Sequence, residues 1–319
     1  MLTAIFLPLA VGLSIFLGGM KVMEVALHHW TGPYMQQALE RFTRTPLRGM
    51  LVGTGLTALV QSSSAITVIT IGLVNAGIMS FPRTLGIVLG TNIGTCLTTE
   101  LIGLNINRAA VPLLLSSASV WLASWLPGGG KRRPSLLSRI LLRLRYPSLA
   151  VSGFACILLG MDVMQVIVPA LKSRGLFAWF VEQSQESLLW GIIAGACLTA
   201  IIQSGAATIA MAMGLASVQA ISVELGIAIT LGANIGTCAT ALIASIGGSK
   251  YGRYVAWAHT LLNIGGAALF YPFISLLYAA SAALASAPSG QIAHAQTLFN
   301  IATSLIALPF CYLRVFRNL

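Results

Sequence analysis

Charged residues are scarce in this chain. Its 319 residues include 18 lysines and arginines but only 7 aspartates and glutamates, so 8% of the residues are charged while 57% are hydrophobic. So few charges cannot cover the solvated surface of a soluble protein of this length. The composition therefore excludes a soluble domain and indicates an all-α polytopic membrane protein.

Spacings typical of metal sites, disulfides and hydrolytic active sites are also missing. The chain holds neither a Gly-x-Ser-x-Gly elbow nor a His-Glu-x-x-His pair, so an intramembrane enzyme that uses serine or histidine is a remote alternative. No organic cofactor is expected. The cysteines all lie within apolar segments and are expected to be packing residues: Cys96, Cys156, Cys197, Cys238 and Cys311.

The net charge of +11 comes from basic residues in short segments between apolar runs, which is the positive-inside pattern. The segment 128–147 is the most basic, with Lys131, Arg132, Arg133, Arg139, Arg143 and Arg145. We expect this connection to be cytoplasmic and to contact anionic lipid headgroups rather than nucleic acid. Counting the predicted crossings from it places the N-terminus outside and the C-terminus in the cytoplasm.

An internal repeat dominates the sequence. Residues 53–102 align with residues 195–244 without a gap, and roughly 19 of about 50 positions are identical. The identities include Gln61 and Gln203, Ser62 and Ser204, and much of the segments Gly90–Cys96 and Gly232–Cys238. Packing alone would preserve mainly apolar or small residues, so the shared Gln, Asn, Ser and Thr residues indicate a pair of functional sites.

Polar residues interrupt the apolar runs 50–77 and 190–219 near their middles. Backbone freed by such a break is tolerated at membrane depth only where it lines a polar cavity, so each run is predicted to be a re-entrant helical hairpin. In each copy the Gly-x-Asn-Ile-Gly-Thr segment that follows is predicted to break a transmembrane helix, because glycine disfavours helix.

These features predict two repeats of inverted topology, since the first repeat contains an odd number of crossings. We expect a first repeat at 1–127, the basic cytoplasmic linker at 128–147, a second repeat at 148–280, and a final transmembrane helix with the C-terminus at 281–319. Inverted repeats that contain broken helices are the plan of secondary transporters, with the site near the membrane midplane.

The two hairpin tips suit a tetrahedral oxyanion. A half-helix that begins at Ser62, Ser63 and Ser64 offers free amides, the positive end of its dipole, and hydroxyl donors. The equivalent tip is Gln203, Ser204 and Gly205. Oxygen ligands for a hard cation such as sodium come from the neighbouring segments: Thr57, Thr91, Asn92, Thr95, Thr199, Asn234 and Thr237. The alternative interpretation of the Gly-x-Asn-Ile-Gly-Thr segments is tight helix packing with interhelical hydrogen bonds.

Gln61-Ser62-Ser63-Ser64 followed by Gly90-Thr91-Asn92-Ile93-Gly94-Thr95, with their second copies, resembles the sodium/phosphate cotransporter family of type II symporters. The segment Gly19–Met23 and the pairs from His259 to Asn263 and from His294 to Asn300 are similar to it too. The resemblance implies sodium-coupled symport of inorganic phosphate by alternating access, in the plasma (inner) membrane of a prokaryote. It also implies that Gln61 and Gln203 serve phosphate and sodium, with His259, Asn263, His294 and Asn300 as possible support.

Two departures accompany the resemblance. The second tip reads Gln203-Ser204-Gly205-Ala206, two hydroxyls short of the family's usual Gln-Ser-Ser-Ser, although Thr208 could partly compensate. Bacterial members often add a cytoplasmic domain that resembles the phosphate-uptake regulator, and this sequence reaches Leu319 without one. A phosphate exporter or a transporter of another small oxyanion stays an alternative. The histidines are more often packing residues, with proton coupling the minority interpretation, and a homodimer is left open.

Overall fold

The structure is a computed structural model that describes residues 5–126, 136–172 and 175–313. Every regular element within these ranges is a helix, and several are long and apolar enough to cross a membrane. The prediction of an all-α polytopic membrane protein is therefore confirmed. The predicted linker lies partly outside the described residues, at 127–135, while its remainder, 136–147, forms the start of a long helix.

The chain divides into two compact units, and each takes segments from both sequence repeats. The first comprises Met1–Pro33 and Ile106–Ala170, and the second comprises Tyr34–Asn105 and Leu171–Leu319. Helix α1 (Leu7–Phe42) is continuous from the first unit into the second. Every residue that the sequence predicts for the binding site belongs to the second unit.

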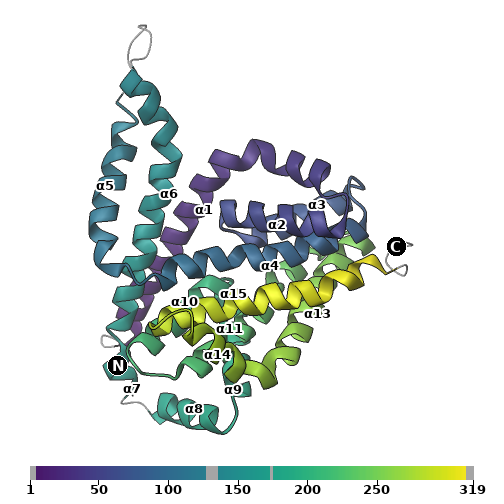
Figure 1. The fold of residues 1–319 in the computed structure, drawn as a ribbon. Helices are drawn as coiled ribbons and strands as arrows, with labels where there is room; N and C mark the ends of the chain where they lie inside the picture. Colours follow the sequence, from purple (N-terminus) through teal and green to yellow (C-terminus); the bar gives the residue numbers. More distant parts are fainter. Residues whose placement is uncertain (1–4, 127–135, 173–174, 314–319) are drawn as a thin grey trace. The chain divides into compact units, whose positions relative to one another are not determined.

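The first unit contains part of α1, the short η2 (Asn107–Ala109), α5 (Ala110–Ala123), α6 (Leu136–Gln165) and the start of α7 (Val168–Lys172). Helices α5 and α6 lie side by side (Figure 1), joined by a 2.8 Å hydrogen bond between the hydroxyls of Ser117 and Ser152. Helix α1 approaches α6 closely at Gly19, where a Cβ atom would lie 2.6 Å from the carbonyl oxygen of Gly153. Small residues at such crossings let apolar helices pack in lipid.

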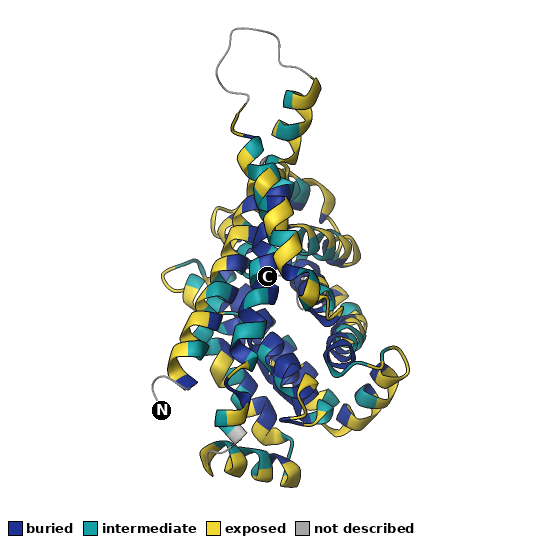
Figure 2. Cartoon of the chain, turned by 90° about the vertical axis from the view of Figure 1, so that its left-hand side faces the viewer, coloured by how far each residue is buried: buried dark blue, intermediate teal, exposed yellow. Residues whose placement is uncertain are grey.

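The second unit contains the hairpins and the helices that surround them. Its elements are α2 (Pro46–Val60), α3 (Ser63–Asn75), α4 (Phe81–Gly103), α8 (Gly175–Glu186), α9 (Leu189–Ile202), α10 (Gly205–Ser217), α11 (Val223–Gly236), α12 (Cys238–Ala244), α13 (Lys250–Phe270), η3 (Tyr271–Phe273), α14 (Ile274–Ala282), α15 (Pro288–Ala307) and η4 (Leu308–Tyr312). In the first copy α2 packs on α4, and in the second α9 packs on α11. Helices α4 and α11 are mostly buried. Figure 2 shows exposed residues on the outward faces of the helices and buried residues on the faces that pack together.

Helix length separates the spans from the hairpins. The candidate spans among the described residues are Leu7–Gly32, Phe81–Gly103, Leu136–Gln165, Val223–Ala244, Lys250–Ala282 and Pro288–Tyr312. Helices α2, α3, α9 and α10 have 13 to 15 residues each, about 20 Å, which is short of the ~30 Å hydrocarbon core. Their length and their shared break fit the predicted hairpins. Helix α5 has 14 residues.

The predicted break at Gly90–Thr95 is wrong for the first copy, because α4 runs uninterrupted from Phe81 to Gly103. The glycines there serve close packing: a Cβ atom at Gly94 would lie 2.6 Å from the carbonyl oxygen of Thr54 in α2. Only the second copy is interrupted, at Thr237 between α11 and α12, and that residue keeps right-handed helical angles. The alternative interpretation, tight helix packing, describes this segment better than unwinding does.

Candidate functional site

The two hairpin tips have the same backbone conformation. Gln61 ends α2 in the left-handed region at φ 59°, and Gln203 ends α9 at φ 60°. The next residues, Ser62 and Ser204, are extended and cap the following helices. A left-handed residue followed by an extended one ends one helix and starts another within two residues. The Gln-Ser pair therefore encodes the tip in both copies.

Three hydrogen bonds hold Gln61 in this strained conformation. Its backbone N–H donates to the carbonyl of Thr57 at 2.7 Å, and its side-chain Nε2 donates to the carbonyl of Ala58 at 2.5 Å. Its Oε1 accepts from the hydroxyl of Thr98 on α4 at 2.6 Å. The side chain thus ties the tip to α4, and both ends of the amide are occupied within the protein.

Gln203 repeats the arrangement with equivalent partners. Its backbone N–H donates to Thr199 at 2.7 Å, its Nε2 donates to Ala200 at 2.5 Å, and its Oε1 accepts from the hydroxyl of Thr240 at 2.9 Å. Thr98 and Thr240 were not among the predicted site residues. They are identical, equivalent positions of the repeat, so the alignment itself carried the signal that would have identified them.

The helix starts leave amides available at each tip. The hydroxyl of Ser62 accepts from the amide of Ala65, and the hydroxyl of Ser204 accepts from the amide of Ala207. The first backbone bonds within the helices come later, from Ile66 and from Thr208. The first-turn amides of residues 63 and 64, and of 205 and 206, therefore lie at the positive ends of two helix dipoles. Such termini suit an anion.

Gly205, one of the two departures at the second tip, has a packing explanation. A Cβ atom at Gly205 would lie 2.7 Å from the Cγ2 methyl of Thr237. The hydroxyl of Thr237 donates to the carbonyl of Asn234 at 2.7 Å, whereas that of the equivalent Thr95 donates to Thr91 at 2.8 Å. The two threonines thus hydrogen-bond differently, and only the second copy requires a glycine at the helix start.

Thr208, expected to compensate for the missing hydroxyls, is buried within the hairpin. Its hydroxyl accepts from Thr199 at 2.8 Å and donates to the carbonyl of Ser204 at 3.3 Å, which joins α9 to α10. In the first copy Ile66 occupies the equivalent position. The hydroxyl of Thr57, equivalent to Thr199, is therefore buried without a hydrogen-bond partner.

The asparagines of the two Gly-x-Asn-Ile-Gly-Thr segments meet at Asn263 on α13. Asn92 donates from Nδ2 to Oδ1 of Asn263 at 2.6 Å, and Asn263 donates from its own Nδ2 to the carbonyl of Asn234 at 2.8 Å. All three residues are buried. One amide therefore connects α4 to α11, which brings together the segments predicted to bind the cation. Thr91 donates to the carbonyl of Val88 within α4.

The two predicted histidines occupy different environments. His259 on α13 is buried, and neither ring nitrogen has a hydrogen-bond partner. His294 on α15 is half-buried and lies 2.9 Å from the carboxylate of Glu100 on α4. That carboxylate also accepts from the hydroxyl of Thr297 at 2.5 Å. The contact between His294 and Glu100 was not apparent from the sequence because the two residues are far apart in the chain.

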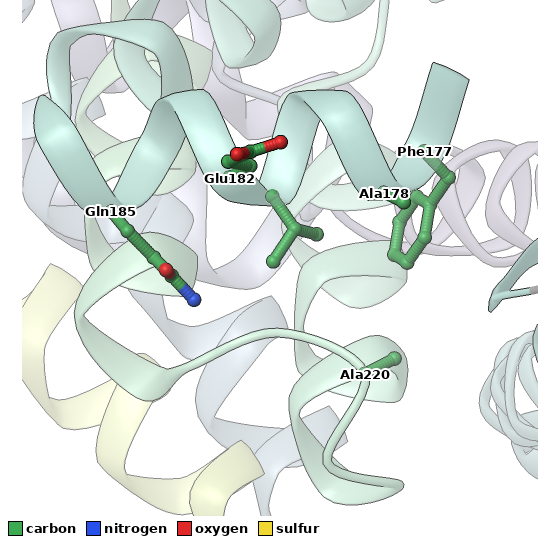
Figure 3. A pocket seen from close by; sticks show the side chains of 6 residues that line it. Phe177, Ala178, Glu182, Gln185 and Ala220 are labelled. Carbon is green, nitrogen blue, oxygen red and sulfur yellow. The ribbon is translucent and has the colours of Figure 1, made fainter. Parts of the chain in front are cut away.

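Among the described residues, no group of three or more His, Cys, Asp or Glu side chains could hold a metal ion. The cation ligands that the site offers are hydroxyl and amide oxygens, which suit sodium better than zinc. A pocket of about 370 Å³ opens beside α8, lined by Phe177, Ala178, Val181, Glu182, Gln185 and Ala220 (Figure 3). None of the predicted site residues lines this pocket.

Comparison with known proteins supports the internal repeat. A family model described as Na+/Pi-cotransporter matches the chain twice, at residues 15–166 and 156–308. Each match contains one hairpin and one Gly-x-Asn-Ile-Gly-Thr segment. No solved structure matches the chain.

Individual relatives match most or part of this chain. The "Uncharacterized protein YqeW" of Bacillus subtilis is 32% identical over 92% of this chain and 91% of its own length. The "Putative inorganic phosphate export protein YjbB" of Escherichia coli is 25% identical over 97% of this chain, which spans 54% of YjbB. The "Sodium-dependent phosphate transport protein 2A" of Oryctolagus cuniculus is 39% identical over 59 residues, which are 18% of this chain and 9% of that protein.

Proposed function

Because this chain belongs to the Na+/Pi-cotransporter family, we propose that it is a secondary transporter that moves inorganic phosphate together with sodium by alternating access. The family is one of transporters and not of enzymes, and the helices are those of a multi-pass membrane protein. What the proposal adds for this chain is the coupling ion, the substrate and the residues that bind them.

The observation that carries the proposal is the duplicated tip. Two helix N-termini, at Ser62 and Ser204, begin inside apolar hairpins after a left-handed glutamine. Oriented amides and hydroxyls hold an oxyanion without a full positive charge, so the site binds phosphate and still releases it. We assign phosphate to the first-turn amides of both tips and to the hydroxyls of Ser63 and Ser64.

Sodium belongs beside the anion, where it offsets the charge. Two observations support this: Asn92 and Asn234 converge on Asn263, and the buried hydroxyl of Thr57 has no hydrogen-bond partner. Amide, hydroxyl and carbonyl oxygens are the ligands that sodium takes in transporters of inverted-repeat architecture. The glutamines position the tips, since each side-chain amide is hydrogen-bonded within the protein through both its nitrogen and its oxygen.

Export is the second candidate direction, and the name of the Escherichia coli relative favours it. A symporter is reversible, so the gradients set the direction of net movement and the same site serves both. The orientation that we propose places the N-terminus outside and the basic segment inside, against anionic lipids. We keep the repeat boundaries near 127, 148 and 280 as part of this proposal.

Uptake of radiolabelled phosphate into liposomes tests the proposal. The purified protein is reconstituted and given an inward sodium gradient or an equal potassium gradient. We expect accumulation with sodium only, its loss in Gln61→Ala, and its retention in Gln36→Ala, which changes an exposed glutamine on α1. Phosphate movement that is equal in both salts would contradict sodium coupling. If no phosphate moves in either salt or in either direction, the assignment of phosphate as the substrate is contradicted.

A further inference from the structure

Two helices of the second unit carry a second, shorter repeat. Ala256, Ala258, Thr260, Leu261, Asn263 and Ile264 on α13 recur on α15 as Ala293, Ala295, Thr297, Leu298, Asn300 and Ile301. In this register His259 is equivalent to Gln296, and His294 is equivalent to Trp257. Helix α13 packs on α3 of the first hairpin, and α15 packs on α10 of the second. The two helices therefore pack on the two hairpins in equivalent ways.

The contacts around two buried cysteines confirm this equivalence. Asn263 donates from Nδ2 to the sulfur of Cys238, and Asn300 donates from Nδ2 to the sulfur of Cys96, both at 3.2 Å. Each sulfur in turn lies near the carbonyl oxygen of the residue four positions before its asparagine, at 3.7 Å for His259 and 3.9 Å for Gln296. The same short sequence thus makes the same contacts on opposite sides of the unit.

The symmetry is broken at the remaining asparagine contacts. Asn92 on α4 reaches across to α13 and donates to Oδ1 of Asn263 at 2.6 Å. Its equivalent, Asn234, donates instead to the carbonyl of Thr230 in its own helix at 3.0 Å. The Oδ1 of Asn300, which is equivalent to the acceptor of Asn263, is buried and has no partner. The bond between Asn92 on α4 and Asn263 on α13 is formed, and the equivalent bond between Asn234 on α11 and Asn300 on α15 is not.

The hydrogen-bond partners fix which end of the amide is the oxygen in Asn92, Asn234 and Asn263. Asn263 and Asn234 both donate to backbone carbonyls, which only accept, so their Nδ2 atoms are assigned. Oδ1 of Asn263 must therefore face Nδ2 of Asn92. A buried amide oxygen without a partner is costly inside a membrane protein, so the unmade bond of Asn300 requires an explanation.

We propose that the four asparagines form an exchangeable latch that decides which side of the membrane the site opens to. The pair Asn92–Asn263 holds the access state described here, and the pair Asn234–Asn300 holds the opposite state. Inverted repeats reach the two states by exchanging conformations between the copies. Exchange makes one bond as it breaks the other, so neither state gains a hydrogen bond overall. The inference rests on the proposed alternating access.

Substitutions of Asn263 and Asn300 should shift the balance between the two access states in opposite directions. Asn263→Leu removes the bond that holds this state, whereas Asn300→Leu removes the unpaired oxygen from this state and the bond from the other. Both variants lose an equivalent contact to a cysteine sulfur, and Asn263→Leu also loses the bond to the carbonyl of Asn234. Thr303→Val is a neutral control on α15, because its hydroxyl donates only to carbonyls of its own helix.

Thiol accessibility reads out the access state. A cysteine is placed at Ser63, which is half-buried at the first tip, after Cys156, Cys197 and Cys311 are replaced by alanine; the buried Cys96 and Cys238 are kept. A membrane-impermeant maleimide is applied from outside to right-side-out vesicles and to inside-out vesicles. The measured quantity is the ratio of the two labelling rates.

We expect Asn263→Leu and Asn300→Leu to change this ratio in opposite directions by about fivefold each, the factor that one net hydrogen bond gives. Thr303→Val should leave it unchanged. A ratio that moves the same way in both leucine variants, or that moves in neither, would overturn the latch. If leucine prevents folding, Asn263→Ser and Asn300→Ser are measured by the same criterion.

The experiment is independent of the transport assay. Labelling requires neither phosphate nor sodium, so opposite shifts would support the latch even if phosphate proved to be the wrong substrate. Conversely, sodium-dependent phosphate uptake combined with unidirectional shifts would keep the proposed function and reject the latch.

Discussion

The bond between Thr98 and Gln61 offers a direct test of how the tips are held. Gln61 adopts a left-handed conformation, which costs a non-glycine residue roughly 1 kcal/mol. Thr98→Val keeps the side-chain volume and removes the donor to Oε1. A net hydrogen bond is worth about 1 kcal/mol, and more when the acceptor left behind is buried. We expect the apparent KM for phosphate to rise about fivefold, because the first-turn amides lose their orientation.

The equivalent substitution should have a smaller effect. Gln203 is exposed, whereas Gln61 is half-buried, so water can replace the hydroxyl of Thr240 more easily. Thr240→Val is therefore expected to change KM by about twofold at most. Thr98→Ser keeps a hydroxyl and should retain most of the affinity for phosphate. Phosphate uptake into liposomes, measured over a range of phosphate concentrations, gives KM and the maximal rate separately.

A control separates the loss of the bond between Thr98 and Gln61 from a general loss of stability. Thr70→Val removes a buried hydroxyl of α3 that donates only to the carbonyl of Ile66 in its own helix, so it should lower thermal stability without raising KM. The reasoning would be refuted if Thr98→Val left KM unchanged, or if Thr98→Val and Thr70→Val raised KM equally.

Further substitutions test the packing around the tips. Gly205→Ser should lower the melting temperature because its Cβ meets the methyl of Thr237, and adding Thr237→Ser should restore it; a stable single variant would contradict the packing explanation. Gly94→Ala should prevent folding or cost several degrees, since its Cβ would overlap α2. In contrast Gly55→Ala, with open space around it, should stabilise α2 by about 0.5 to 1 kcal/mol. Equal effects of Gly94→Ala and Gly55→Ala on stability would be evidence against close packing at Gly94. Glu100→Gln should weaken sodium-driven uptake, since it removes the carboxylate that His294 and Thr297 contact; unchanged uptake would be evidence against a role for these contacts.

Sequence reasoning was most successful where a local signal sufficed. The break at Gln61 and Gln203 was predicted because a polar cluster divides an apolar run, and the structure ends one helix and starts another at those residues. The family was identified from the same motifs, and the family comparison matches both copies. A polar cluster that recurs with its neighbouring residues is informative, because the same residues must form the same local backbone conformation in both copies.

Sequence reasoning failed where the outcome depends on distant partners. Glycines in Gly90–Thr95 were expected to unwind a helix, but helix propensity is a weak prior that packing overrides. Gly94 lies against α2, which stabilises the helical form of α4. Thr98 and Glu100 were missed as site residues for a similar reason, because their partners Gln61 and His294 approach only after the hairpin and α15 have folded against α4. Neither contact has a signature within a short window of sequence.

The two hairpin tips match in backbone and differ in several neighbouring side chains, and this difference has a consequence for binding. The tip glutamines have φ angles of 59° and 60° and equivalent hydrogen bonds. Around them Ser63 is replaced by Gly205, Ile66 by Thr208, and Glu100 by Leu242. Exchange between access states requires equivalent backbones, whereas equivalent ligand sites would require equivalent side chains. We therefore expect the half-sites to bind different parts of one ligand set rather than two copies of one ligand.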